Sequence, residues 1–205
     1  LDPATPAEAR EMVKYAFNLS ERLSLPVILR PTTRTCHACQ DIEVAEVTER
    51  PRPAPGFEKN PGWVIMPGLA LRRHAWLNQQ QEVARELLEE SGFNRLINLD
   101  DEHEQAEAGI ITCGVSYNYV REALDLLWLK VPVLKIGTPY PLPNRLVLDF
   151  LTRVKRVLVV EEQEPAVEDQ VIALAWRNKM LTGISGKNDR LVPREGELDT
   201  DKVKT

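Results

Sequence analysis

Residues 109–119 (GIITCGVSYNY) form an apolar run that turns on a glycine directly into a helical pattern. The same order of elements then repeats. A strand is predicted at 133–136, and a further strand at 157–160, each followed by a proline-containing turn and an amphipathic helix. Strands that alternate with helices are typical of a parallel sheet covered by helices on both faces. We therefore predict an α/β fold, a three-layer α/β/α domain with a mostly parallel sheet.

Composition excludes several classes of protein. The net charge of −5 disfavours binding to nucleic acid or to anionic lipid, since both are polyanions. We find no apolar run near the ~20 residues of a membrane span, and no signal segment at the start. Three cysteines in 205 residues indicate reduced thiols and predict a cytoplasmic protein.

The first part of the chain reads as the end of another domain. Thr5-Pro6-Ala7-Glu8 is a capping box that opens an amphipathic helix, and residues 26–30 (PVILR) are predicted to form a short buried strand. One helix and one strand cannot bury their own apolar faces, so we expect them to belong to a larger sheet. The chain starts at Leu1, as if cut from a longer protein.

Four regions are expected along the chain. Residues 1–48 hold the domain remnant and a polar loop, and the proline-rich residues 49–61 are predicted to be a linker because each proline disfavours helix before it. Residues 62–185 carry the α/β domain. Residues 186–205 are predicted to be a polar tail on the surface.

The CxxC pattern at Cys36 and Cys39 is the first candidate for chemistry. Such a pair can bind zinc or act as a redox dithiol. Zinc needs four ligands, and the sequence has no second CxxC or HxxxH pair. A redox CxxC normally opens a helix after a strand, whereas residues 40–44 read as extended. We interpret both cysteines as ordinary thiols and predict no metal site.

The turn after the strand at 109–113 is a candidate anion site. Backbone amides and a helix N-terminus converge there, with Thr112, Gly114 and Ser116 beside them and Ser116 expected to cap the helix. The turn lacks GxGxxG and GxxxxGK[ST], so it supports neither dinucleotide nor triphosphate binding. The simpler alternative is that Gly114 only permits a tight turn.

Two polar segments complete the candidates. The acidic run at 161–164 could supply paired carboxylates for acid–base chemistry. We favour a structural role, in which it interacts with the N-terminus of the helix that Pro165 opens. Residues 32–37 are dense in hydrogen-bonding groups, and Arg34 could clamp a carboxylate there or the loop could dock two domains. Both readings stay open.

Five segments in order resemble one family, the alpha subunit of indolepyruvate ferredoxin oxidoreductase, a 2-oxoacid:ferredoxin oxidoreductase. They are residues 29–37 (LRPTTRTCH), 109–124 (GIITCGVSYNYVREAL), 140–143 (YPLP), 159–165 (VVEEQEP) and 186–198 (GKNDRLVPREGEL).

The first of these segments resembles the family's arginine-containing loop. The resemblance assigns Arg34, Thr35 and His37 to a substrate or domain-interface loop. This chain has Cys36 where the family usually has serine, which further weakens the metal reading of the CxxC.

The resemblance implies an enzyme that decarboxylates aryl 2-oxoacids oxidatively to acyl-CoA. It implies thiamine diphosphate, Mg²⁺, 4Fe-4S clusters and coenzyme A in the parent enzyme. The Gly-Asp-Gly run and the CxxCxxC set expected for these groups are absent here. We therefore expect a structural, interfacial fragment with a transketolase C-terminal-like domain, no catalytic residue and no cofactor of its own.

The expected partners are the remaining domains of the alpha subunit, the beta subunit and ferredoxin, with a homodimer as a further assembly. A rival reading is a stand-alone interaction module that binds a phosphate-bearing ligand such as coenzyme A at the Gly114 turn. Fold alone does not separate the two. A third reading is a subunit of another thiamine enzyme, which the loop at 33–37 disfavours.

Overall fold

The computed structural model describes residues 1–44, 56–59, 62, 64, 66–99 and 105–204. Most of the predicted linker 49–61 lies outside the described residues. The described elements, in order, are α1 (Pro6–Leu23), α2 (Thr33–His37), α3 (Pro67–Glu89), β1 (Arg95–Ile97), β2 (Gly109–Cys113), α4 (Ser116–Leu126), β3 (Val133–Ile136), α5 (Asn144–Thr152), β4 (Arg156–Val160), α6 (Ala166–Arg177), β5 (Gly183–Ser185) and α7 (Thr200–Lys204).

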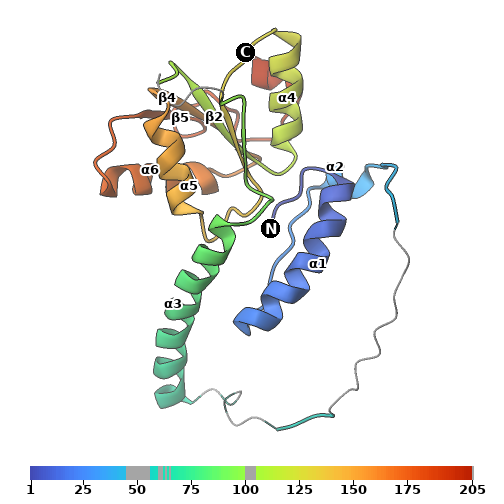
Figure 1. Cartoon of the computed structure of the whole chain (residues 1–205), viewed down its shortest axis with the longest axis vertical. Coiled ribbons are helices and arrows are strands. Elements are labelled where there is room, and N and C mark those ends of the chain that lie inside the picture. Colours follow the sequence, from blue (N-terminus) through green and yellow to red (C-terminus); the bar gives the residue numbers. More distant parts are fainter. Residues whose placement is uncertain (45–55, 60–61, 63, 65, 100–104, 205) are drawn as a thin grey trace.

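The five described strands form one sheet in the order β1-β3-β2-β4-β5 (Figure 1). Strands β3, β2, β4 and β5 run parallel, and β1 pairs antiparallel with β3 at one edge. Helices α5 and α6 cover one face, and α4 with α7 covers the other. The predicted three-layer, mostly parallel α/β fold is confirmed.

Each central strand alternates its side chains between two hydrophobic cores. Ile111 of β2, Leu134 of β3 and Val159 of β4 point toward α5 and α6. Their neighbours Val133 and Val160 point toward α4 instead. This period of two is what a pleated strand buried on both faces requires.

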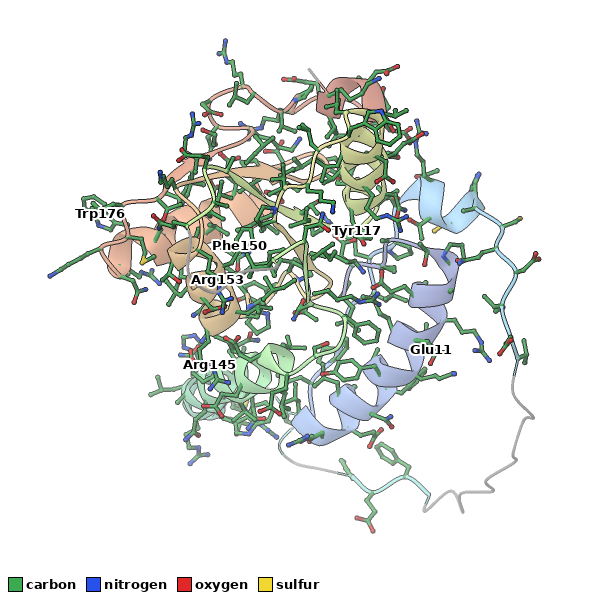
Figure 2. The ribbon with its side chains drawn as sticks, turned by 45° about the horizontal axis from the view of Figure 1, so that its top comes forward. Glu11, Tyr117, Arg145, Phe150, Arg153 and Trp176 are labelled. Atoms are coloured by element: carbon green, nitrogen blue, oxygen red, sulfur yellow. The ribbon has the colours of Figure 1, made fainter. Side chains whose placement is uncertain are left out.

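Helices α5 and α6 each bury one face against the sheet and leave the other face in solvent. Phe150 is fully buried between α5 and the sheet, whereas Trp176 at the end of α6 is 84% exposed and points away from the protein (Figure 2).

Helices α1 and α3 lie together beyond the carboxyl end of the sheet (Figure 1). Leu19 and Leu23 of α1 pack against Ala84 and Leu88 of α3 in a small third core. Of the predicted capping box, one half is confirmed: the Thr5 hydroxyl accepts from the Glu8 amide. The Glu8 carboxylate instead accepts from the amide of Ala4.

The strand predicted at 26–30 is wrong. The segment is extended, but within the described residues it joins no sheet. Its backbone is bonded to Leu1 instead, where the amide of Arg30 donates to the Leu1 carbonyl at 2.9 Å. Ile28 is 78% exposed, so the segment is not buried either. An apolar run becomes a strand only when a neighbouring strand satisfies its backbone groups.

The segment 186–204 packs on the sheet domain. Val192 and Leu198 are buried in the core beneath α4, and α7 lies against α4. Among the described helices, even the 23-residue α3 is too polar to cross a lipid bilayer.

Candidate functional site

The carboxyl edge of the sheet is where the predicted site segments meet. From β2 the chain crosses to β3 on one side and then returns to β4 on the other side. The crevice outside the carboxyl ends of β2 and β4 is therefore the switch point at which open α/β sheets usually bind ligands. It is the natural place to look for a site.

A carboxylate of the chain itself lies in this crevice. Asp2 is 1% exposed, and a Cβ placed on Gly114 would come within 2.7 Å of its Oδ1. Arg30 donates to Asp2 Oδ2 at 2.8 Å, and the Asp2 amide donates to the Gly137 carbonyl. Gly114 has a φ of +53°, so the turn needs glycine for both its conformation and its contact with Asp2.

The other two residues of the predicted anion turn lie beneath it. Thr112 and Ser116 are fully buried, and neither hydroxyl has a hydrogen-bond partner in the described part of the chain. The expected Ser116 cap is wrong, because Val115 is the N-cap and supplies no side-chain bond. The backbone forms a tight turn at Gly114, because the amide of Tyr117 donates to the Gly114 carbonyl three residues earlier.

Cys113 is the last residue of β2, and the Asp2 and Glu161 carboxylates lie near its thiol. Burial raises the pKa of its thiol well above the ordinary value, and the Asp2 and Glu161 carboxylates raise it further. A thiol in this setting stays protonated, and a protonated thiol is a poor nucleophile. Cys113 is therefore a packing residue.

The loop predicted around Arg34 is a short helix, α2, capped by the Thr32 hydroxyl. Thr35 is buried, and its hydroxyl lies 3.2 Å from that of Thr32. Arg34 donates from Nε to Glu197 at 2.9 Å and lies 5.9 Å from the centre of the Tyr119 ring. His37 is exposed. The structure thus fixes two of these residues and leaves the third in solvent.

A polar cavity of about 410 Å³ lies beside α2 at the sheet edge. Its lining includes Arg30 and Arg34 together with two carboxylates, Glu162 and Glu197. Burial raises the pKa of Glu162 above its ordinary value. Thr35, His37 and the turn at 112–116 do not line the cavity, so of the residues predicted in the loop and the turn the structure brings only Arg34 to it.

The structural interpretation of the acidic run is confirmed. Both Glu161 oxygens accept from the amide of Val167, and Oε1 also accepts from the amide of Glu168. The Glu161 carboxylate thus satisfies the free amides at the start of α6. Glu164 forms an exposed ion pair with Arg194.

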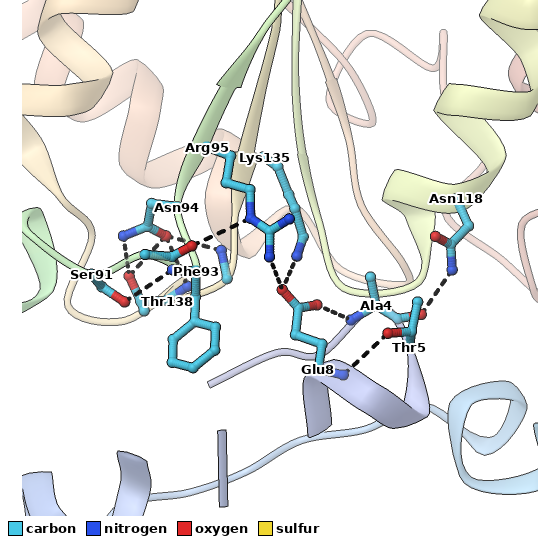
Figure 3. Close-up of polar contacts among 12 residues, drawn as sticks. Ala4, Thr5, Glu8, Ser91, Phe93, Asn94, Arg95, Asn118, Lys135 and Thr138 are labelled. Carbon is cyan, nitrogen blue, oxygen red and sulfur yellow. Dashed lines mark hydrogen bonds and ion pairs between the residues drawn. The ribbon is translucent and has the colours of Figure 1, made fainter. Parts of the chain in front are cut away.

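Sequence reasoning missed a buried ion pair that joins α1 to the sheet (Figure 3). Lys135 of β3 donates to Glu8 Oε1, and Arg95 of β1 lies 3.9 Å from the same oxygen. Asn118 of α4 donates to the Ala4 carbonyl at 2.7 Å and ties the same end of α1 to a second element. The signal was available, because Lys135 interrupts the apolar run VPVLKIG.

Curated proteins resemble this chain over almost its full length, although no family model matches it. The "Indolepyruvate oxidoreductase subunit IorA" of Pyrococcus horikoshii is 42% identical over 98% of the chain. Subunits of the same name from Methanothermobacter marburgensis and Archaeoglobus fulgidus are 38% and 34% identical over 100% of it. The resemblance to this alpha subunit is confirmed.

The chain spans about a third of the length of these curated relatives, 31% in the Pyrococcus horikoshii subunit and 32% in the other two. Among solved structures, a 2-oxoglutarate:ferredoxin oxidoreductase from Magnetococcus marinus matches with a TM-score of 0.45 and 18% identity. That match covers 91% of this chain and 28% of the other.

The residues present do not fit the cofactors that the resemblance implies. At the turn that could cradle a diphosphate, the Asp2 carboxylate already lies against Gly114. A 4Fe-4S cluster commonly takes four cysteines, whereas the sequence has three, two of them exposed and one buried. No group of three or more metal-ligating side chains occurs within the residues that the structure describes.

Proposed function

We propose that this chain is part of an indolepyruvate-type 2-oxoacid:ferredoxin oxidoreductase, which oxidatively decarboxylates aryl 2-oxoacids to acyl-CoA. The observation that carries the proposal is the identity of 34–42% to IorA subunits over nearly the whole chain. In that enzyme, thiamine diphosphate with Mg²⁺, 4Fe-4S clusters and coenzyme A would be bound outside these residues.

The role we propose for the chain is structural and interfacial. Two ion pairs lie at the sheet edge and join residues of the chain to one another: Asp2 with Arg30, and Arg34 with Glu197. Residues 62–185 would form a transketolase C-terminal-like domain, with 1–48 as the end of a preceding pyrimidine-binding domain, 49–61 as linker and 186–205 as tail. The partners would be the remaining alpha-subunit domains, the beta subunit and ferredoxin.

A chimaeric enzyme tests the proposal. The matching third of the Pyrococcus horikoshii subunit is replaced by this chain, and ferredoxin reduction is measured with indolepyruvate and coenzyme A. We expect the chimaera to keep at least a tenth of the parental activity. The matched control is the same subunit with that third deleted, which should be inactive. An assembled, cofactor-loaded chimaera without activity would contradict the proposal.

The isolated chain provides a second, independent measurement. Thiamine diphosphate with Mg²⁺ should leave its melting temperature unchanged, because a ligand raises it only when it binds the folded state. A rise of several degrees at saturating ligand would show that these residues do hold the cofactor. A rise with coenzyme A alone would favour the rival reading, a stand-alone module.

We also propose a cytoplasmic location. Cys36, Cys39 and Cys113 are all free thiols, as is usual in a reducing compartment.

A further inference from the structure

Three buried polar side-chain atoms at the junction of β2 and α4 have no hydrogen-bond partner within the part of the chain that the structure describes. They are the hydroxyl oxygens of Thr112 and Ser116, two residues that are 0% exposed, and Oδ1 of Asp2, which is 1% exposed. A buried polar atom without a partner costs free energy, so native structures contain few of them. Three at one junction indicate that they share a partner.

The three atoms are grouped around the Gly114 turn. Thr112 pairs with Val160 in the sheet, so its side chain lies on the same face as Val160, which packs toward α4. Ser116 is the first residue of α4, and this helix packs on β2. Asp2 lies against the turn between them, since a Cβ placed on Gly114 would come within 2.7 Å of its Oδ1.

The charges around the junction disfavour an ion as the shared partner. The Asp2 and Glu161 carboxylates both lie near the adjacent Cys113 thiol, and they would repel an anion. A cation is disfavoured as well, because Arg30 already pairs with Asp2 at 2.8 Å and the N-terminus of α4 carries partial positive charge. A neutral molecule meets neither obstacle.

The burial of the junction limits the size of that molecule. This chain alone covers Thr112 and Ser116 completely, so the remainder of a longer protein is not needed to enclose them. Water is the small neutral molecule that is always present when a chain folds. It can accept from a hydroxyl and donate to a carboxylate, and buried waters typically make about three hydrogen bonds to otherwise unpaired groups.

We propose that one buried water molecule is bound at the junction of β2 and α4. It accepts from the hydroxyls of Thr112 and Ser116 and donates to Asp2 Oδ1. The water thereby joins the N-terminal segment, the sheet and α4 at a single point. The inference is independent of the proposed function, because it rests on contacts within this chain.

The variant Thr112→Val tests the proposal through the sign of its effect on stability. Valine keeps the branched shape of threonine and lacks the hydroxyl. Because a hydrogen bond to the water is lost, we expect the melting temperature of the 205-residue chain to fall by roughly 2–4 °C. A hydroxyl with no partner would give the opposite sign, since its removal relieves the cost of burying it. An unchanged or higher melting temperature would therefore overturn the proposal.

A second measurement counts the bound water directly. Oxygen-17 relaxation dispersion detects water molecules that stay inside a protein for longer than the protein takes to tumble. We expect the double variant Thr112→Val/Ser116→Ala to lose the signal of one such water, whereas Thr33→Val, at an exposed position, should keep the signal and change the melting temperature by at most about 2 °C.

The two substitutions in the double variant should also be coupled. Each removes a partner of the same water, so their losses in melting temperature should be less than additive. An unchanged dispersion signal, or fully additive losses, would each overturn the proposal. If the double variant does not fold, the sign of the change in Thr112→Val decides alone.

Discussion

Replacement of Lys135 by methionine should be among the most damaging single changes in this protein. The Lys135 side chain is 3% exposed and the Glu8 side chain 7% exposed, so the pair is almost fully removed from water. Lys135→Met keeps the apolar volume of the side chain and removes its charge. Glu8 is then left buried, with the Ala4 amide as its remaining close donor and Arg95 at 3.9 Å.

The magnitude follows from the cost of an uncompensated buried charge. Removing one partner of such a pair costs about 3–5 kcal/mol. Because Arg95 offers partial compensation to Glu8, we expect the lower end, about 3 kcal/mol. In a chain of this size that corresponds to a fall in melting temperature of roughly 6–12 °C. A loss of about 3 kcal/mol is a large share of the 5–15 kcal/mol that typically stabilises a folded protein.

Urea and thermal unfolding at pH 7, followed by circular dichroism, measure this loss. The double variant Glu8→Gln/Lys135→Met removes both charges and should recover more than half of it. Lys130→Met, an exposed position just before β3, serves as the matched control and should change the free energy of unfolding by at most about 0.5 kcal/mol. A Lys135→Met protein as stable as the wild type would refute the reasoning, as would a double variant as unstable as the single one.

Three further changes test other parts of the structure. Thr5→Ala removes the N-cap of α1 and should cost about 1 kcal/mol, a fall of roughly 2–4 °C in melting temperature by calorimetry. Gly114→Ala forces a side chain into a left-handed turn against Asp2 and should cost more than about 1 kcal/mol in urea unfolding; Asp2→Ala in the same chain should recover part of that. Burial raises the pKa of Glu161, so its contribution to stability is present below its unfolded pKa of about 4.3 and is lost as pH rises through the raised value. From pH 4 to 7 the wild type should therefore lose stability relative to Glu161→Gln; a constant difference between the two would contradict this.

The central strands could be predicted because their sequences are typical of strands buried on both faces of a sheet. Residues 110–113 and 133–136 are short, mostly apolar and flanked by glycine or proline, and residues 157–160 are four consecutive apolar residues; such runs are typical of buried strands. The edge strands β1 and β5 could not, since each has three residues and no fully buried position. Such an edge strand forms because it pairs with a strand that is already part of the sheet, and the sequence does not indicate which strands lie side by side.

The candidate site was predictable only in part for the same reason. The acidic run acts locally on the helix that follows it, and its role was predicted correctly. The contact of Asp2 with Gly114 and the pairing of Glu8 with Lys135 join residues more than a hundred positions apart. Neither residue of such a pair identifies its partner, although Lys135 within an apolar strand indicates that a partner exists.

The separation of 127 positions between Glu8 and Lys135 also affects the chain while it is being made. Helix α1 is synthesised before Lys135, which follows about 6–25 s later at roughly 5–20 residues per second. During that interval Met12, which is fully buried in the finished fold, and the rest of the apolar face of α1 cannot reach their final contacts with the sheet. We therefore expect nascent chains halted before residue 135 to be bound by chaperones, and those halted well beyond it to be released.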